Sequence, residues 1–134
     1  MDESRLRRIP VFAGLSKKQR KLVAQSADEI DVEAGTYMCR EGDSAYEFFA
    51  IIDGSAKVVR GDQYLNELGP GDFFGEMGLL AKRPRNASVI VRSRLTAVVM
   101  TGPAFRHIDR EMPEVAKKIR RAIEERAHWL EAVG

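Results

Sequence analysis

Residues 68–91, which read LGPGDFFGEMGLLAKRPRNASVIV, decide how the rest of this chain can fold. Gly69, Gly71 and Gly75 punctuate the first half, and one short helical turn is predicted over Glu76–Ala81. The first backbone N–H groups of such a turn have no partner inside the helix, and they attract anions. The first half of the stretch therefore predicts an anion-binding turn.

The second half of the stretch is a basic loop that leads into a β-branched run, Ser88–Val91, which predicts a strand. Pro84 fixes the backbone beside Arg85, whose guanidinium can hold a phosphate. Glu76, in the preceding turn, can accept a hydrogen bond from a hydroxyl. A phosphate and a sugar hydroxyl bound side by side indicate a nucleotide.

Two half-motifs at a fixed spacing, Phe74–Leu80 and Pro84–Ser88, give this stretch a family resemblance that extends over nearly the whole chain. It resembles the phosphate-binding cassette of cyclic nucleotide-binding domains, the family of protein kinase A regulatory subunits and the catabolite activator protein. The resemblance implies that Glu76 takes the ribose 2′-hydroxyl and Arg85 the cyclic phosphate. The contact residues that it implies are Val58, Phe74, Gly75, Glu76, Met77, Gly78, Leu79, Arg85, Asn86 and Ala87.

The residue after the arginine bears on which base is preferred. In the resembled family, alanine at this position goes with cyclic AMP and threonine with cyclic GMP. This chain has Asn86, whose side-chain amide can donate or accept a hydrogen bond. We expect cyclic AMP ahead of cyclic GMP as the ligand, and no metal cofactor.

Length and composition suit a single domain, residues 1–134, because 134 residues with 44% hydrophobic and 31% charged residues can bury one core. The only cysteine, Cys39, has no partner for an internal disulfide. The longest apolar run, Phe48–Ile52, is too short to cross a bilayer, so we expect a cytoplasmic protein without membrane insertion. The net charge of +2 does not by itself indicate a nucleic-acid partner.

Three segments are expected within this domain: N-terminal helices (1–27), a β-barrel (28–101) that carries the cassette (73–88), and C-terminal helices (102–134). The middle segment alternates short apolar runs with turn residues, which is typical of an all-β barrel. The predicted fold class is mainly β with flanking helices, an eight-stranded jelly-roll barrel. Strands are expected near Glu29–Val32, Tyr37–Arg40, Phe48–Asp53, Ala56–Arg60 and Tyr64–Leu68, with two more after the cassette.

Several turns separate these strands. The pair Asp53–Gly54 predicts a hairpin between the third and fourth strands, and Gly61–Asp62 predicts a turn between the fourth and fifth.

The N-terminal segment predicts two helices joined by a hydrophobic connector. Glu3–Ile9 reads as a helix stopped by Pro10, and Ser16 caps a second helix that runs to about Ala27. The basic residues here invite a nucleic-acid or membrane interpretation, but surface helices are ordinarily charged, which is the interpretation that we favour. These residues are Arg5, Arg7, Arg8, Lys17, Lys18, Arg20 and Lys21.

After the barrel, a short helix is expected over Ala104–Arg110, and Pro113 opens a longer helix that reaches about Leu130. The resemblance implies that this helix closes over the base and passes the signal to an effector protein or to a second copy of the chain. Trp129 could cap the base, pack on the barrel or serve a partner. The four residues after Leu130 leave no room for a helix-turn-helix, so no direct DNA binding is expected.

An enzymatic function is not indicated. A metal-dependent jelly-roll enzyme needs histidines on strands, whereas His107 and His128 are both in predicted helices. Cys39 has no histidine near it in sequence. Ser88 is not flanked by the glycines that form the tight turn around a catalytic serine, the nucleophile elbow. We therefore predict a stand-alone cyclic nucleotide-binding regulatory module that signals by movement of its C-terminal helix. The alternative is a jelly-roll interaction domain that binds no nucleotide.

Overall fold

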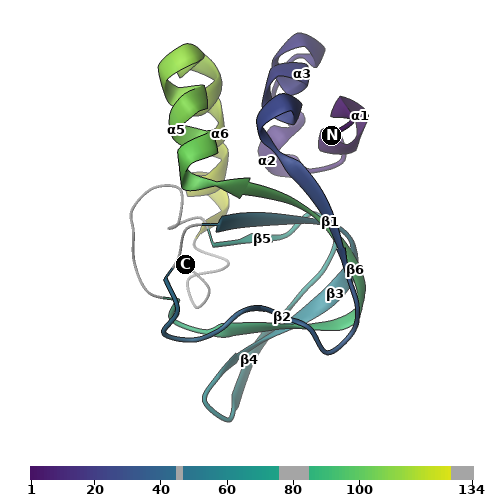
Figure 1. Cartoon of the computed structure of the whole chain (residues 1–134). Helices are drawn as coiled ribbons and strands as arrows, with labels where there is room; N and C mark the ends of the chain where they lie inside the picture. The colour runs from purple at the N-terminus through teal and green to yellow at the C-terminus, as the bar shows by residue number, and fades with distance from the viewer. Residues whose placement is uncertain (45–46, 76–84, 128–134) are drawn as a thin grey trace.

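The structure is a computed structural model that describes residues 1–44, 47–75 and 85–127. The helices are α1 (Glu3–Leu6), α2 (Pro10–Ala13), α3 (Lys17–Ser26), α5 (Gly102–Glu111) and α6 (Pro113–Ala127). The strands are β1 (Asp28–Val32), β2 (Tyr37–Cys39), β3 (Glu47–Arg60), β4 (Gln63–Leu68), β5 (Phe73–Phe74) and β6 (Ser88–Thr101). The helices of the described residues gather at one end of the strands, and the β3–β4 hairpin lies at the opposite end (Figure 1).

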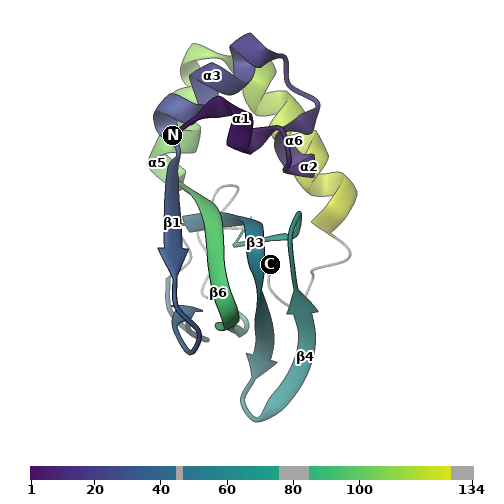
Figure 2. The ribbon, with the colours of Figure 1, turned by 90° about the vertical axis from the view of Figure 1, so that its right-hand side faces the viewer.

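Two long strands, β3 and β6, organise the sheet. Each has 14 residues, and they pair antiparallel along their length. Register shifts between Ile51 and Ala56 divide β3 into two halves, of which the first also pairs with β5 and the second with β4. In the same way, β1 pairs with the C-terminal half of β6, and β2 pairs with its N-terminal half. The strands thus form one antiparallel sheet in which each half of β3 and β6 has its own neighbours, and Figure 2 shows β1 next to the helices and β4 farther from them.

This arrangement confirms the predicted fold class, mainly β with flanking helices in a jelly-roll arrangement. The predicted count of eight strands is not confirmed, because the described residues form six strands in a sheet that is not closed. The difference arises because the predicted strands Phe48–Asp53 and Ala56–Arg60 are one continuous strand, β3. The two strands expected after the cassette are likewise one strand, β6.

The hairpin predicted at Asp53–Gly54 is wrong, because both residues lie inside β3. Gly54 has a φ of +91°, and a Cβ at this position would collide with the backbone of Arg94 and Leu95 on β6. Glycine is therefore required at this bend, where two strands approach closely. A hairpin turn requires glycine for the same conformational reason, so the two cannot be distinguished from the sequence. The turn predicted at Gly61–Asp62 is confirmed, since it joins β3 to β4.

The N-terminal helices differ from the prediction at Pro10. Helix α1 ends at Leu6, and Pro10 occupies the first turn of α2, where its fixed φ and missing N–H cost nothing. The predicted cap at Ser16 is confirmed: its hydroxyl accepts from the Gln19 N–H, and the Gln19 side chain accepts from the Ser16 N–H. The predicted connector therefore contains one helical turn.

Arg20 is not one of the solvated basic residues with which the sequence grouped it. It is buried, and its Nε donates to the Glu3 carboxylate at 3.0 Å. Its Nη1 donates to the carbonyl of Leu15, in the connector before α3. The paired and hydrogen-bonded guanidinium therefore joins α1, α3 and the connector.

The C-terminal helices follow β6 without a gap. The Thr101 side chain caps α5 by accepting from the Ala104 N–H. Helix α6 buries Val115, Ile119 and Ile123, which recur every four residues along one face of the helix. The predicted end of this helix near Leu130, and Trp129, lie outside the described residues. Among the helices described here, none combines the length and the apolar character that crossing a membrane requires.

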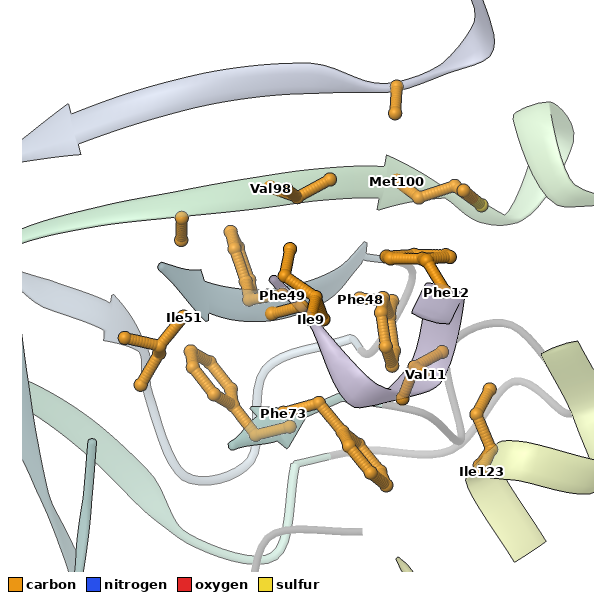
Figure 3. Close-up of a cluster of buried hydrophobic side chains, with 14 of the residues drawn as sticks. Ile9, Val11, Phe12, Phe48, Phe49, Ile51, Phe73, Val98, Met100 and Ile123 are labelled. Carbon is orange, nitrogen blue, oxygen red and sulfur yellow. The ribbon is translucent and has the colours of Figure 1, made fainter. Parts of the chain in front are cut away.

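A cluster of aromatic rings joins the helices to the strands. The ring of Phe12, in α2, meets that of Phe48, in β3, at a centroid distance of 6.4 Å, and Phe48 meets Phe73, in β5, at 5.6 Å. Val11 of α2 and Ile123 of α6 belong to the same cluster (Figure 3). Because Phe73–Phe74 lead directly into Gly75, this core fixes the start of the predicted cassette.

Candidate functional site

Arg85 is the most unusual polar residue in the described part of the chain. Its side chain is buried, with 4% of the residue exposed, and its Nη2 donates to the Glu47 carbonyl at 2.6 Å. Its Nε and Nη1 are also buried and have no hydrogen-bond acceptor among the described residues. Removing a cation from water is costly unless its donors are satisfied. An anion bound beside Arg85 would satisfy both of them.

Gly75 forms the wall of the site next to this guanidinium. Its φ is +80°, and a Cβ on Gly75 would collide with the Glu47 carbonyl and with Arg85 Nη1. Strand β5 holds the approach to Gly75, because Phe74 pairs with Phe49 of β3 and their rings stack at 4.9 Å. Only glycine fits a left-handed conformation that brings the main chain against the guanidinium.

The backbone that carries Arg85 is residues 85–88, which we call the phosphate arm. The Arg85 N–H donates to the Asp43 carbonyl at 2.7 Å, and the Arg85 carbonyl accepts from the Gly42 N–H at 2.8 Å. At the other end of the arm, the Ser88 hydroxyl accepts from the Glu41 N–H at 2.9 Å. The loop between β2 and β3 therefore fixes the phosphate arm through two main-chain hydrogen bonds and one to the Ser88 hydroxyl.

The structure describes six of the ten predicted contact residues. Gly75 and Arg85 are brought together, Phe74 is buried directly before Gly75, and Ala87 is buried in the arm. Asn86 is exposed, and its carbonyl accepts from Arg60. The sixth residue, Val58, is buried in β3 and pairs with Val89 of β6. The other four, Glu76, Met77, Gly78 and Leu79, lie outside the described residues, as does the predicted helical turn at Glu76–Ala81.

Sequence reasoning missed the partners that hold Arg85. The acceptors supplied by Glu47 and Asp43 are main-chain carbonyls, which any residue type could provide. No side-chain pattern therefore marks them. Arg60, which reaches the phosphate arm from the β3–β4 hairpin, looked like an ordinary charged residue at the end of a strand.

Cys39 lies beside the arm but is a poor nucleophile. Its Sγ is 3.8 Å from the Ala87 carbonyl. Burial raises the pKa of the Cys39 thiol, although the positive charge of Arg85 acts in the opposite direction. The thiol is therefore protonated near neutral pH, the form in which a cysteine is a weak nucleophile. In the described ranges, no group of three or more His, Cys, Asp or Glu side chains could hold a metal ion.

Residues 29–111 match the family described as "Cyclic nucleotide-binding domain". The chain belongs to this family. The match runs from β1 to the end of α5, so it includes both Gly75 and Arg85. It confirms the family predicted from the two half-motifs, and this family consists of regulatory nucleotide-binding domains rather than catalysts.

A similar protein supports this assignment. The chain is 35% identical over 107 residues to the cAMP-dependent protein kinase regulatory subunit of Schizosaccharomyces pombe; the aligned part is 79% of this chain and 26% of that protein. The chain thus spans about a quarter of this relative's length.

Two solved structures extend the likeness to the fold. The N-terminal domain of a transcriptional regulator from Streptomyces coelicolor has a TM-score of 0.80 and 25% identity, with 94% of each chain covered. A cyclic nucleotide-binding-like protein from Brucella abortus has a TM-score of 0.70 and 27% identity, with 82% of this chain and 98% of that chain covered.

Proposed function

We propose that this chain is a single regulatory domain that binds cyclic AMP in preference to cyclic GMP and transmits binding through its C-terminal helix. The observation that carries the proposal is the buried guanidinium of Arg85, with two unsatisfied donors among the described residues. A cyclic phosphodiester is a monoanion that would accept from both donors and neutralise the buried charge. The cAMP-dependent regulatory subunit among the relatives supports cyclic AMP as the ligand.

The remaining contacts of the nucleotide are assigned by the resemblance. Glu76 would accept from the ribose 2′-hydroxyl, and the backbone amides near Gly78, Leu79 and Ala87 would donate to the phosphate oxygens. Gly75 lies against Arg85, so the main chain can approach the phosphate closely. The desolvation cost of the guanidinium is already met by folding, which favours binding of an anion to the preformed pocket.

The fold offers a physical route from this site to α6. Phe73, two residues before Gly75, contacts Phe48, which contacts Phe12 of α2. Helix α2 contacts α6, and Pro10 at its start lies against Gly71 in the turn before β5. A shift of the cassette would therefore be felt by α2 and α6 through one packed core. An effector protein or a second copy of the chain would then read the position of α6.

Calorimetric titration of the whole chain with cyclic AMP and with cyclic GMP tests this function. We expect saturable binding of both nucleotides, tighter for cyclic AMP. Tighter binding of cyclic GMP would overturn the base preference. If neither nucleotide bound, the alternative function, a jelly-roll interaction domain that binds no nucleotide, would be the better assignment. Arg94→Ala is a suitable control, because Arg94 is an exposed arginine whose ion pair with Asp31 lies outside the proposed site.

A further inference from the structure

The β3–β4 hairpin touches the phosphate arm although it contributes nothing to the predicted phosphate contacts. Arg60, the last residue of β3, donates from its Nε to the Asn86 carbonyl at 2.8 Å. Asn86 directly follows Arg85 in the chain. The contact therefore holds the peptide between Asn86 and Ala87, one residue beyond the Arg85 side chain that carries the proposed phosphate-binding charge.

The same hairpin is tied to the loop on the other side of the arm. The Glu41 carboxylate accepts from the Gly61 N–H at 2.9 Å, and the Glu41 N–H donates to the Ser88 hydroxyl at 2.9 Å. Because Arg60 and Gly61 are adjacent, these hydrogen bonds form a closed ring. Arg60 of the hairpin binds Asn86 of the arm, Ser88 of the arm binds Glu41, and Glu41 binds Gly61 of the hairpin. The arm is thus held at both ends.

The chemistry of Arg60 suits a residue that holds the phosphate arm in place better than one that stabilises the fold in general. It is exposed and makes no ion pair with a described residue, and its acceptor is a main-chain carbonyl instead of a carboxylate. Exposed charges contribute little to the stability of a fold. A binding site, by contrast, is sensitive to small displacements of a group that must meet its ligand at hydrogen-bond distance.

We propose that Arg60 and Glu41 are positioning residues, through which the β3–β4 hairpin holds Arg85 in register with a bound phosphate. This inference rests on the proposed nucleotide-binding function. It assigns to the hairpin, which lies at the end of the molecule away from the helices, a direct influence on ligand affinity (Figure 2).

The test is a double-mutant cycle measured by calorimetry with cyclic AMP. Arg60→Ala should weaken binding about five- to tenfold, as expected for one hydrogen bond to a positioned group. In the Arg85→Ala background, titrated to millimolar nucleotide, the same change should alter affinity less than about twofold, because the residue being positioned is gone. Arg60→Lys, which keeps a donor and the charge, should restore most of the loss, and Arg94→Ala should bind like wild type.

A second measurement does not depend on the nucleotide. In the free protein, Arg60→Ala should speed hydrogen exchange at the amides of Arg85 and Gly42, while the melting temperature stays close to that of Arg94→Ala. Equal losses of affinity with and without Arg85, or unchanged affinity in Arg60→Ala, would overturn the proposal. If wild type bound no cyclic nucleotide, the proposed function would fail, and unchanged exchange at these two amides would overturn the positioning role on its own.

Discussion

Arg85 is a residue that costs the free protein stability and that the proposed function would use. A buried guanidinium with only one of its nitrogens hydrogen-bonded among the described residues adds little stability to the fold. Under the proposed function, the same group would become a strong ligand contact when the phosphate binds. Function and stability therefore make opposite demands on this position.

The first prediction follows from this opposition. Arg85→Ala should lower the affinity for cyclic AMP by about 2 to 5 kcal/mol, because the phosphate loses its main charged partner in a desolvated pocket. The variant should melt at or above the wild-type temperature, since unsatisfied buried donors have been removed. Calorimetry and thermal unfolding measure the two effects. Binding within threefold of wild type would show that Arg85 does not hold the phosphate.

Gly75 allows a second test with a matched control. Gly75→Ala should destabilise the protein by at least about 1 kcal/mol, because alanine is strained at this positive φ and its methyl group would collide with Glu47 and Arg85. Gly14→Ala adds the same methyl group where no atom lies within 4 Å, and should change stability little. Denaturant unfolding compares the two variants. Equal unfolding midpoints would mean that the backbone at Gly75 is not constrained as described.

The third prediction concerns the sugar and uses the ligand as the probe. Wild type should bind 2′-deoxy cyclic AMP more weakly than cyclic AMP by about 1.5 to 3 kcal/mol, the contribution of a hydrogen bond to a charged acceptor. Glu76→Gln should bind both nucleotides with more similar affinities, because its interaction with the hydroxyl is already weakened. The same sensitivity to the missing hydroxyl in both proteins would assign the 2′-hydroxyl to another residue.

At the scale of single elements, the buried pair between α1 and α3 should matter more than its exposed counterpart. Arg20→Ala leaves the Glu3 carboxylate buried without its partner, which should cost about 3 to 5 kcal/mol of unfolding free energy. Arg5→Ala removes a partly exposed pair with Glu29 and should lower the free energy of unfolding far less, because solvent screens the charges of an exposed pair. Urea unfolding of both variants measures this difference. Similar values for the two would show that Arg20 is solvated.

The elements also show where sequence reasoning works and where it stops. Side-chain identity carried the prediction at Ser16, whose capping box is present, and at the cassette, where Gly75 and Arg85 do meet. It failed at Asp53–Gly54, because a positive φ serves a bend in a long strand as well as a hairpin. It also failed to separate Arg20 from its charged neighbours, since burial depends on how α1 packs, which no local pattern encodes.

The main-chain acceptors of the site could not be predicted from the sequence for a related reason. Glu47 and Asp43 contribute their carbonyls to Arg85, so their side chains carry no signal of that role. Such contacts are set by how strands pair at long range. The sequence can thus single out Gly75 and Arg85, whereas the main-chain carbonyls that position Arg85 leave no mark in it.

At the scale of the whole molecule, the site and the C-terminal helix share one core. Helix α5 continues directly from β6, the strand that begins in the phosphate arm. Helix α6 is attached to α5 by an ion pair between Arg120 and Asp109 at 2.7 Å, and the Arg120 guanidinium lies 5.2 Å from the centre of the Phe105 ring. Under the proposed function, this helical pair would respond as a unit if the ligand changed the packing beneath it.

The last prediction tests this response. A ligand moves a two-state element only when it contacts the two states differently, so binding should alter the surroundings of α6 if that helix is the output. Emission from Trp129, the only tryptophan, should change saturably with cyclic AMP and follow the calorimetric binding curve. Hydrogen exchange should agree, with altered protection of amides from Val115 to Leu130 on binding. Arg85→Ala should shift both responses to higher nucleotide concentration. If cyclic AMP bound tightly while emission and exchange in this segment stayed constant, the helix would be a static scaffold, and the domain would have to signal through another surface.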